Sequence, residues 1–231
     1  MVGLRGSQAA RRPRVPVTIG PGGLAPVLVL AAVFGAFGAK AGLPVAMAAL
    51  LGGIGGTASL LVHELGHVRA ARRLAGIRSA AVSLIWAGAA TRFEGSYANG
   101  REQARVAIAG PQASLAFALS LLAAVFLPVP LAVKELLLVL VLFNVAIGLL
   151  NLVPAHPLDG HKLAVGLLWC ATGSERKARK IIRRIGLGWA AIELPSAAFL
   201  LVQKPHLGLA LVVMAASLFV QKRLTRNPRT A

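Results

Sequence analysis

Apolar residues form long runs with few charges along the chain, separated by short polar stretches, and this pattern is typical of helices that cross a membrane. The run from Ala41 to Val62 contains no charged residue, and at 1.5 Å per residue it would make about 33 Å of helix, enough for a bilayer core of roughly 30 Å. Comparable runs cover residues 24–39, 104–127, 131–151, 185–202 and 207–220. The pattern therefore predicts an all-α polytopic membrane protein with about six transmembrane helices.

The first apolar run, residues 24–39, is short for a span and allows two interpretations. A cleaved signal peptide would also start basic, continue apolar and end in small residues such as those at 39–41. A retained helix is favoured, because 23 residues before the apolar run are many for a signal peptide. We expect residues 1–23, which are basic and contain Pro and Gly, to form a flexible tail.

The second run contains several glycines, including the small-xxx-small pair Gly52 and Gly56. Such residues let helix backbones approach closely in lipid, where packing drives helix association. We therefore expect this helix near the centre of the bundle, and Gly76 is a candidate for its end.

The stretch from Ser79 to Glu94 has a different pattern from the apolar runs. Val82, Leu84 and Trp86 alternate with smaller residues, Gly88 offers a turn, and residues 90–93 can return as a second strand. We interpret this stretch as a small membrane-associated β-hairpin; the alternative is an irregular apolar loop.

Prolines mark two breaks in the later runs. Pro111 is expected to interrupt the third span near its start, and Pro154 and Pro157 break the chain after the fourth span, with a restart near Leu158. Broken backbone at membrane depth is tolerated mainly where it lines a cavity in the protein. The segment from Asn151 to residue 160 is therefore a candidate part of a site.

Composition and charge support this interpretation. The 231 residues are 57% hydrophobic with a mean hydropathy of +0.74, which excludes an ordinary soluble domain. We expect one transmembrane domain over residues 24–221, with basic tails over 1–23 and 222–231.

The formal net charge of +18 could by itself suggest nucleic-acid binding, but no nucleic-acid partner is expected, because the charge follows the positive-inside rule. With six spans, every Lys and Arg except Lys40, Lys134 and Lys204 lies on the side that holds both termini. We therefore expect a multi-pass protein of the cell membrane with both termini cytoplasmic.

The sequence His63-Glu64-Leu65-Gly66-His67 follows the second run directly. Two histidines at i and i+4 share one helix face and can reach one Zn²⁺, and the Glu beside the first His can act on a water at that metal. The motif occurs by chance in soluble helices, but ionisable residues at the edge of an apolar span are usually functional. The one cysteine, Cys170, excludes a Cys-rich zinc site.

A catalytic zinc normally has three protein ligands. Two carboxylates are candidates for the third ligand. Asp159 lies in the predicted break and faces the same end of the bundle as the histidines, whereas Glu94 belongs to the hairpin outside the spans. Topology therefore favours Asp159 as the third ligand, with Glu94 as the alternative.

With these motifs the chain resembles the site-2 protease family of intramembrane zinc metalloproteases, in a compact form without a PDZ or CBS domain. The resemblance covers about residues 45–165. It is carried by residues 63–67, by Ala109-Gly110-Pro111, and by the segment from Asn151 through Pro154 to Pro157-Leu158-Asp159-Gly160.

The resemblance implies that His63, His67 and Asp159 bind one Zn²⁺ per chain, that Glu64 is the catalytic base, and that Asn151 positions the substrate or polarises its carbonyl. Two positions depart from the family's usual form, His156 and His161. Each could support the ligands or replace one, or could be solvated or bonded to the backbone.

The implied function is hydrolysis of a peptide bond in or near a transmembrane segment of a membrane protein, as in regulated intramembrane proteolysis, with the active site towards the cytoplasm. A separate regulatory protein is a possible further partner. The alternative is a membrane metal-binding or transport protein that hydrolyses nothing. Against it, a binding site gains little from Glu64 beside the first ligand.

Overall fold

The structure, a computed structural model, describes residues 15–20, 22–85, 88–155 and 158–185. The spans predicted over 185–202 and 207–220 lie, beyond residue 185, outside these residues, as does the tail predicted over 222–231. The described elements are, in chain order, β1 (Val17–Ile19), α1 (Leu24–Lys40), α2 (Val45–Ala71), β2 (Ile77–Ile85), β3 (Gly88–Gly95), α3 (Gly100–Ala124), α4 (Leu131–Leu150) and α5 (Asp159–Thr172). Residues 175–185 are also helical.

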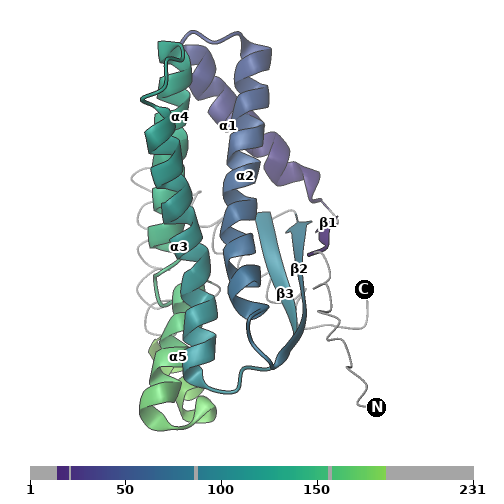
Figure 1. Cartoon of the computed structure of the whole chain (residues 1–231), viewed down its shortest axis with the longest axis vertical. Helices are drawn as coiled ribbons and strands as arrows, with labels where there is room; N and C mark the ends of the chain where they lie inside the picture. The colour runs from purple at the N-terminus through teal and green to yellow at the C-terminus, as the bar shows by residue number, and fades with distance from the viewer. Residues whose placement is uncertain (1–14, 21, 86–87, 156–157, 186–231) are drawn as a thin grey trace, which may run out of the picture.

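Three helices of the described part, α2, α3 and α4, are long and apolar enough to cross a membrane. The predicted first span is indeed a helix, α1, but its 17 residues make only about 26 Å at 1.5 Å per residue. Three of the six predicted spans are therefore found at full length. Figure 1 shows α2, α3 and α4 running along the long axis, with α1 oblique to them.

Helix α2 carries the predicted second span and the histidine motif in one unbroken helix. It begins after Pro44, which has an extended backbone, and it ends at Ala71 rather than at Gly76. The prediction for Gly76 was wrong because this residue serves a close contact: a Cβ there would lie 2.3 Å from the carbonyl oxygen of Ser96. Gly76 lets the chain enter β2 beside the end of β3.

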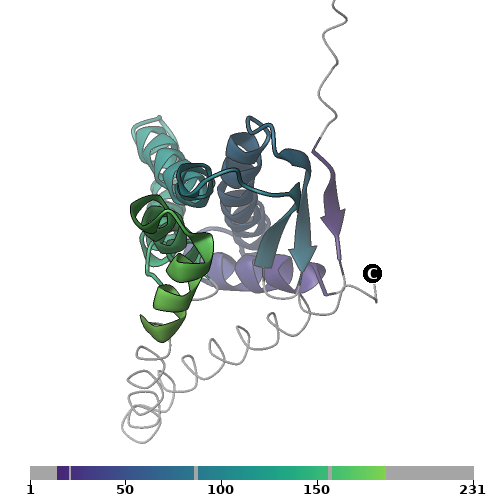
Figure 2. The ribbon, with the colours of Figure 1, turned by 90° about the horizontal axis from the view of Figure 1, so that it is seen from below.

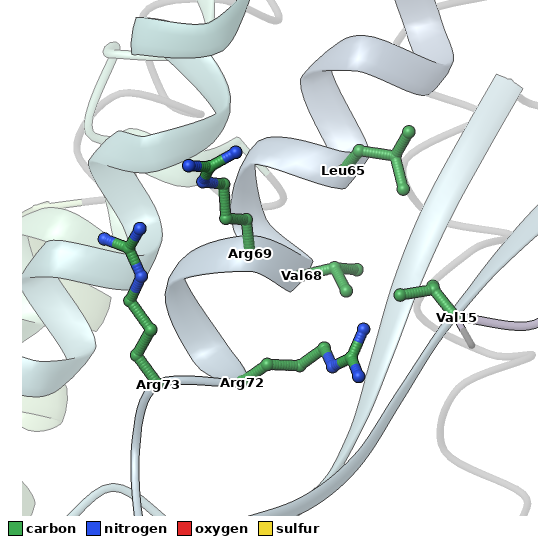
Figure 3. A pocket seen from close by; sticks show the side chains of 6 residues that line it. All are labelled: Val15, Leu65, Val68, Arg69, Arg72 and Arg73. Atoms are coloured by element: carbon green, nitrogen blue, oxygen red, sulfur yellow. The ribbon is translucent and has the colours of Figure 1, made fainter. Parts of the chain in front are cut away.

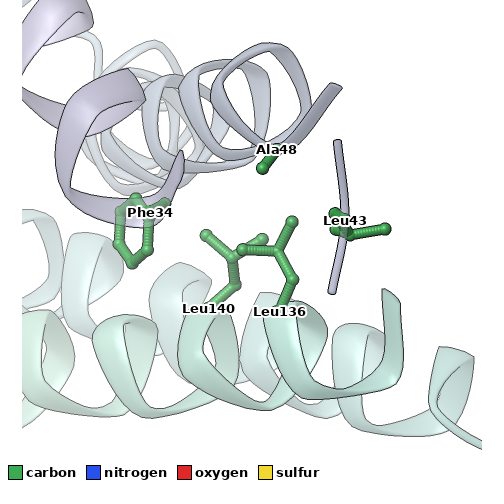
Figure 4. Close-up of a cluster of buried hydrophobic side chains, with 5 residues drawn as sticks. All are labelled: Phe34, Leu43, Ala48, Leu136 and Leu140. Carbon is green, nitrogen blue, oxygen red and sulfur yellow. The ribbon is translucent and has the colours of Figure 1, made fainter. Parts of the chain in front are cut away.

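The glycine face of α2 packs closely on its neighbours, as the small-residue pair predicted. A Cβ on Gly52 would lie 2.6 Å from the Cβ of Phe34, and one on Gly55 would lie 2.5 Å from Leu140. The apolar cluster beside these contacts joins α1, α2 and α4 and consists of Phe34, Leu43, Ala48, Leu136 and Leu140 (Figure 4). Close packing on α1 and α4 fixes α2 at the centre.

The predicted hairpin is confirmed. Strands β2 and β3 pair antiparallel, with Val82 opposite Thr91 and Ile85 opposite Gly88. The sheet packs on α2 through a buried cluster of Val68, Ala80 and Val82. The order of the strands is β1-β2-β3, and β3 is the strand nearest α2 (Figures 1 and 2).

Part of the predicted N-terminal tail is structured. Residues 17–19 form β1, which pairs parallel with β2 and brings Val17 opposite Val82. The backbone N–H of Val82 donates to the carbonyl of Pro16 at 3.0 Å. Three residues are too few to give a periodic pattern, so only the neighbouring strand reveals this one.

Helix α3 continues through Pro111, so the predicted interruption was wrong. A proline removes one helical hydrogen bond, but α3 packs against α2, α4 and α5, and such neighbours hold a proline-containing helix together in a membrane. Its start is capped, because the Asn99 side chain accepts from the N–H of Glu102. The break after α4 is confirmed: α4 ends at Leu150 and α5 starts at Asp159.

Candidate metal centre

Three buried side chains meet where α2, α3 and α5 pack together. His63 and His67 lie one turn apart on α2, and Asp159 is the first residue of α5. Asp159 Oδ2 lies 3.0 Å from Nε2 of His63 and 2.9 Å from Nε2 of His67. The two Nε2 atoms are 3.3 Å apart. Three potential ligand atoms therefore face one point.

The other ring nitrogen of each histidine is held by α3. Nδ1 of His67 lies 2.7 Å from the carbonyl oxygen of Val106, and because a carbonyl only accepts, this Nδ1 carries the proton. Nδ1 of His63 lies 2.9 Å from the hydroxyl of Ser114. Partners of this kind fix the ring orientation and leave Nε2 free to bind a metal.

Asp159 is held by a residue of its own helix. Lys162 Nζ donates to Oδ1 at 3.2 Å, so Oδ2 is the oxygen left for the histidines. A nearby lysine charge favours the ionised form of a carboxylate, and this is the form that binds metals.

Gly110 provides space at the meeting point. A Cβ on Gly110 would lie 2.2 Å from Nε2 of His67 and 2.8 Å from Nε2 of His63. This space is beside both ligand nitrogens and is kept open by the missing side chain. Two imidazole nitrogens, one carboxylate oxygen and this space fit a zinc ion.

Glu64 follows His63 on α2 and turns towards the sheet. The hydroxyl of Thr91 on β3 donates to its Oε2 at 2.5 Å, and Glu64 is half-buried. The competing carboxylate, Glu94, is exposed near the end of β3 and is not in the metal-binding group that the described residues form.

The remaining predicted residues lie around this group. Asn151 follows the last residue of α4. Its side-chain N–H donates to the carbonyl of Ile147 at 2.9 Å, and its own carbonyl accepts from the N–H of Gly160 at 2.6 Å. His161 is half-buried and does not belong to the metal-binding group found among the described residues. His156 lies outside the residues that the structure describes.

Sequence reasoning missed Ser114, the Val106 carbonyl and Thr91. Ser114 had a signal, because it follows Gly110 by one helical turn inside an apolar span, where polar residues tend to face the bundle. The Val106 carbonyl had no such signal in the sequence, since every residue has a backbone carbonyl.

A cavity of about 520 Å³ lies beside α2, and its lining does not include the metal-binding group. Its lining residues are Val15, Leu65, Val68, Arg69, Arg72 and Arg73. Figure 3 shows Arg72 directed towards Val15 and the side chains of Arg69 and Arg73 on the other side. The metal-binding group instead lies in the packed interior.

Comparison with known proteins identifies the family. The model of peptidase family M50 matches residues 53–131 and 128–192, which is more than half of the chain and includes the three residues that meet. The chain belongs to peptidase family M50. The site-2 protease family inferred from the sequence motifs is thereby confirmed, and with its apolar helices this M50 chain is a membrane protein.

Relatives support this membership. The chain is 34% identical over 142 residues to a putative zinc metalloprotease of Synechocystis, covering 60% of this chain. It is 35% identical over 148 residues to the putative zinc metalloprotease Rip3 of Mycobacterium tuberculosis, covering 61% of this chain. In both cases the aligned part spans 37% of the length of the relative.

A solved structure shares the fold. The site-2 protease from Methanocaldococcus jannaschii superposes with a TM-score of 0.59 at 23% sequence identity, covering 90% of each chain.

Proposed function

We propose that this M50 member is an intramembrane zinc metalloendopeptidase that hydrolyses a peptide bond in or near a transmembrane segment of a membrane protein. The observation that carries the proposal is the convergence of His63 and His67 on Asp159 at 3.0 and 2.9 Å, with Glu64 next to the first histidine.

In this proposal zinc is held by Nε2 of His63, Nε2 of His67 and Oδ2 of Asp159. Zinc, when bound, supplies Lewis acidity, which lowers the pKa of water and polarises a carbonyl. The role of the chain is orientation: Ser114 and the Val106 carbonyl fix the rings. The adjacent α3 backbone at Gly110 leaves the required space.

Glu64 acts as the general base. Its carboxylate accepts a proton from the attacking water and passes that proton to the leaving amine. Its place beside His63 on α2 supports this role, and so does its half-buried position facing β3.

Asn151 is proposed to position the substrate or to polarise its carbonyl. Its side chain donates to the Ile147 carbonyl, and binding of a substrate would exchange that acceptor for the carbonyl of the substrate. The hydrogen bond from Gly160 to the Asn151 carbonyl ties this residue to the residue after Asp159, which supports a role beside the ligands.

The substrate must unwind before attack, because a helix hides its peptide groups in internal hydrogen bonds. We infer that the unwound segment pairs with β3. This strand is at the edge of the described sheet, and an extended peptide can add to such an edge. The cytoplasmic placement of the active site and of both termini is part of the same proposal and rests on the distribution of Lys and Arg.

The test is cleavage of single-span reporter proteins in membranes, with zinc content measured in parallel. We expect the intact protein and Glu94→Gln to cleave, and Glu64→Gln to retain zinc without cleaving. Removal of zinc by a chelator should abolish cleavage, and added zinc should restore it.

If every variant binds zinc and Glu64→Gln cleaves as fast as the intact protein, the proposed role of Glu64 is contradicted. Zinc without cleavage of any reporter would favour the alternative, a metal-binding or transport protein. Absence of zinc from the intact protein would overturn the proposal.

A further inference from the structure

The hydroxyl of Thr91 contacts Glu64 at two atoms. Thr91 Oγ1 lies 2.5 Å from the carboxylate oxygen Oε2 and 3.3 Å from the carbonyl oxygen of the same residue. A carboxylate can only accept, so the threonine donates its proton to Oε2. The hydrogen bond joins β3 to the residue proposed as the general base.

The sheet determines that Thr91 faces α2. Thr91 lies opposite Val82 in the antiparallel pair, and residues opposite each other point to the same face. Val82 is fully buried in the cluster between the sheet and α2, and Phe93, two residues after Thr91, packs against the same cluster. Val82 and Phe93 thus place the Thr91 side chain on the face of the sheet that packs against α2.

This hydrogen bond limits the orientations of the Glu64 side chain. A glutamate has several rotatable bonds and loses conformational entropy when it is held in one orientation. Thr91 has a branched side chain with restricted χ1, so its hydroxyl is a stiff partner. With Oε2 held by Thr91, Oε1 is left to accept a proton from water.

We propose that Thr91 is a positioning residue for Glu64, and this inference rests on the proposed protease function. The same strand then has two tasks: its backbone edge receives the substrate, and its Thr91 side chain holds the base. In this proposal β3 aligns the Glu64 side chain of α2 with the substrate segment that pairs with the edge of the strand.

The experiment compares three variants of the full-length protein in membranes: Thr91→Val, Thr91→Ser and Thr18→Val. Valine keeps the shape of threonine and removes the hydroxyl, and serine keeps the hydroxyl. Thr18 is the matched control, because its hydroxyl pairs with that of Ser83 at 2.9 Å in the same sheet, away from Glu64. Cleavage of one reporter gives kcat and KM, and zinc content and thermal unfolding are measured for each variant.

We expect Thr91→Val to lower kcat about tenfold, the effect of losing one hydrogen bond to a charged group. KM, zinc content and the unfolding temperature should stay unchanged, because both hydrogen bonds of the hydroxyl go to Glu64, which is not a zinc ligand, and because valine keeps the packing of the side chain. Thr91→Ser should restore most of kcat, and Thr18→Val should behave as the intact protein does.

Equal kcat in Thr91→Val and the intact protein would overturn the inference, as would a faster Thr91→Val, which would mean that Thr91 restrains the base. A parallel loss of zinc or of folding in both Thr91 variants would assign a purely structural role and overturn it too. Failure of the intact protein to cleave any reporter would overturn the proposed function itself. This outcome differs from every result in which the intact protein is active.

Discussion

At the scale of single residues, each histidine of the metal-binding group has its two nitrogens assigned to different partners. Nδ1 of His67 donates to the Val106 carbonyl, and Nδ1 of His63 contacts the Ser114 hydroxyl. Both Nε2 atoms then face Asp159. The orientation of the ligands is therefore decided by α3, a helix that contributes no ligand of its own to the group.

Replacing Ser114 by alanine should weaken zinc binding by about 10- to 100-fold, the usual effect of losing a hydrogen-bond partner of a ligand. The His63 ring would keep its place on α2 and lose the contact that fixes its rotation. A zinc titration of the purified protein measures the effect. Ser120→Ala is the control, because Ser120 lies on the same helix with its hydroxyl bonded to its own backbone, at Ala116. Equal zinc affinity in both variants would contradict the prediction.

At the scale of elements, the break between α4 and α5 carries Asp159 to the histidines. The chain leaves α4 at Leu150 and re-enters a helix at Asp159. The turn is tight at Gly160, where a Cβ would lie 2.2 Å from the carbonyl oxygens of both Leu152 and Val153. Because these are backbone atoms, they cannot move aside as a flexible side chain would.

Gly160→Ala should therefore displace the start of α5 and with it the Asp159 carboxylate. We expect a loss of stability of about 1–3 kcal/mol, the range for an overpacked site, and weaker zinc binding. Thermal unfolding and zinc titration measure the two effects. Cys170→Ala, an exposed position later in α5, is the control and should change neither. Normal zinc affinity in Gly160→Ala would show that the turn does not position Asp159.

At the scale of the whole molecule, α3 lies between the two elements that provide the ligands. It packs against α2, α4 and α5, so the motif on α2 and the motif at the start of α5 reach the same level of the bundle (Figure 1). The positive-inside rule predicts that this level lies towards the cytoplasm.

Cys170 can report this orientation, because it is the one cysteine of the chain and is exposed on α5. A membrane-impermeant thiol reagent should label it in inverted vesicles and leave it unlabelled in intact cells. Phe126→Cys combined with Cys170→Ser should show the reverse, since Phe126 is 83% exposed in the connection at the opposite end of the bundle. Labelling of Cys170 from outside intact cells would contradict the predicted topology.

The sequence determined those features that depend on local pattern. Long apolar runs with few charges predicted helices at α1 to α4, alternation predicted the β2–β3 hairpin, and paired prolines predicted the break before Asp159. The spacing of His63 and His67 placed both on one face of a helix, because that relation is fixed by helical geometry. These properties follow from neighbours in the chain, so the sequence alone contains them.

The tertiary structure decided the features that depend on contacts between distant segments. Strand β1 exists because β2 offers it a partner, and α3 passes through Pro111 among three neighbouring helices. The Val106 carbonyl and Thr91 became site neighbours when α3 and β3 packed on α2. Hydrogen bonds at such sites join residues 27 to 96 positions apart, and local patterns do not encode which of many polar groups will meet.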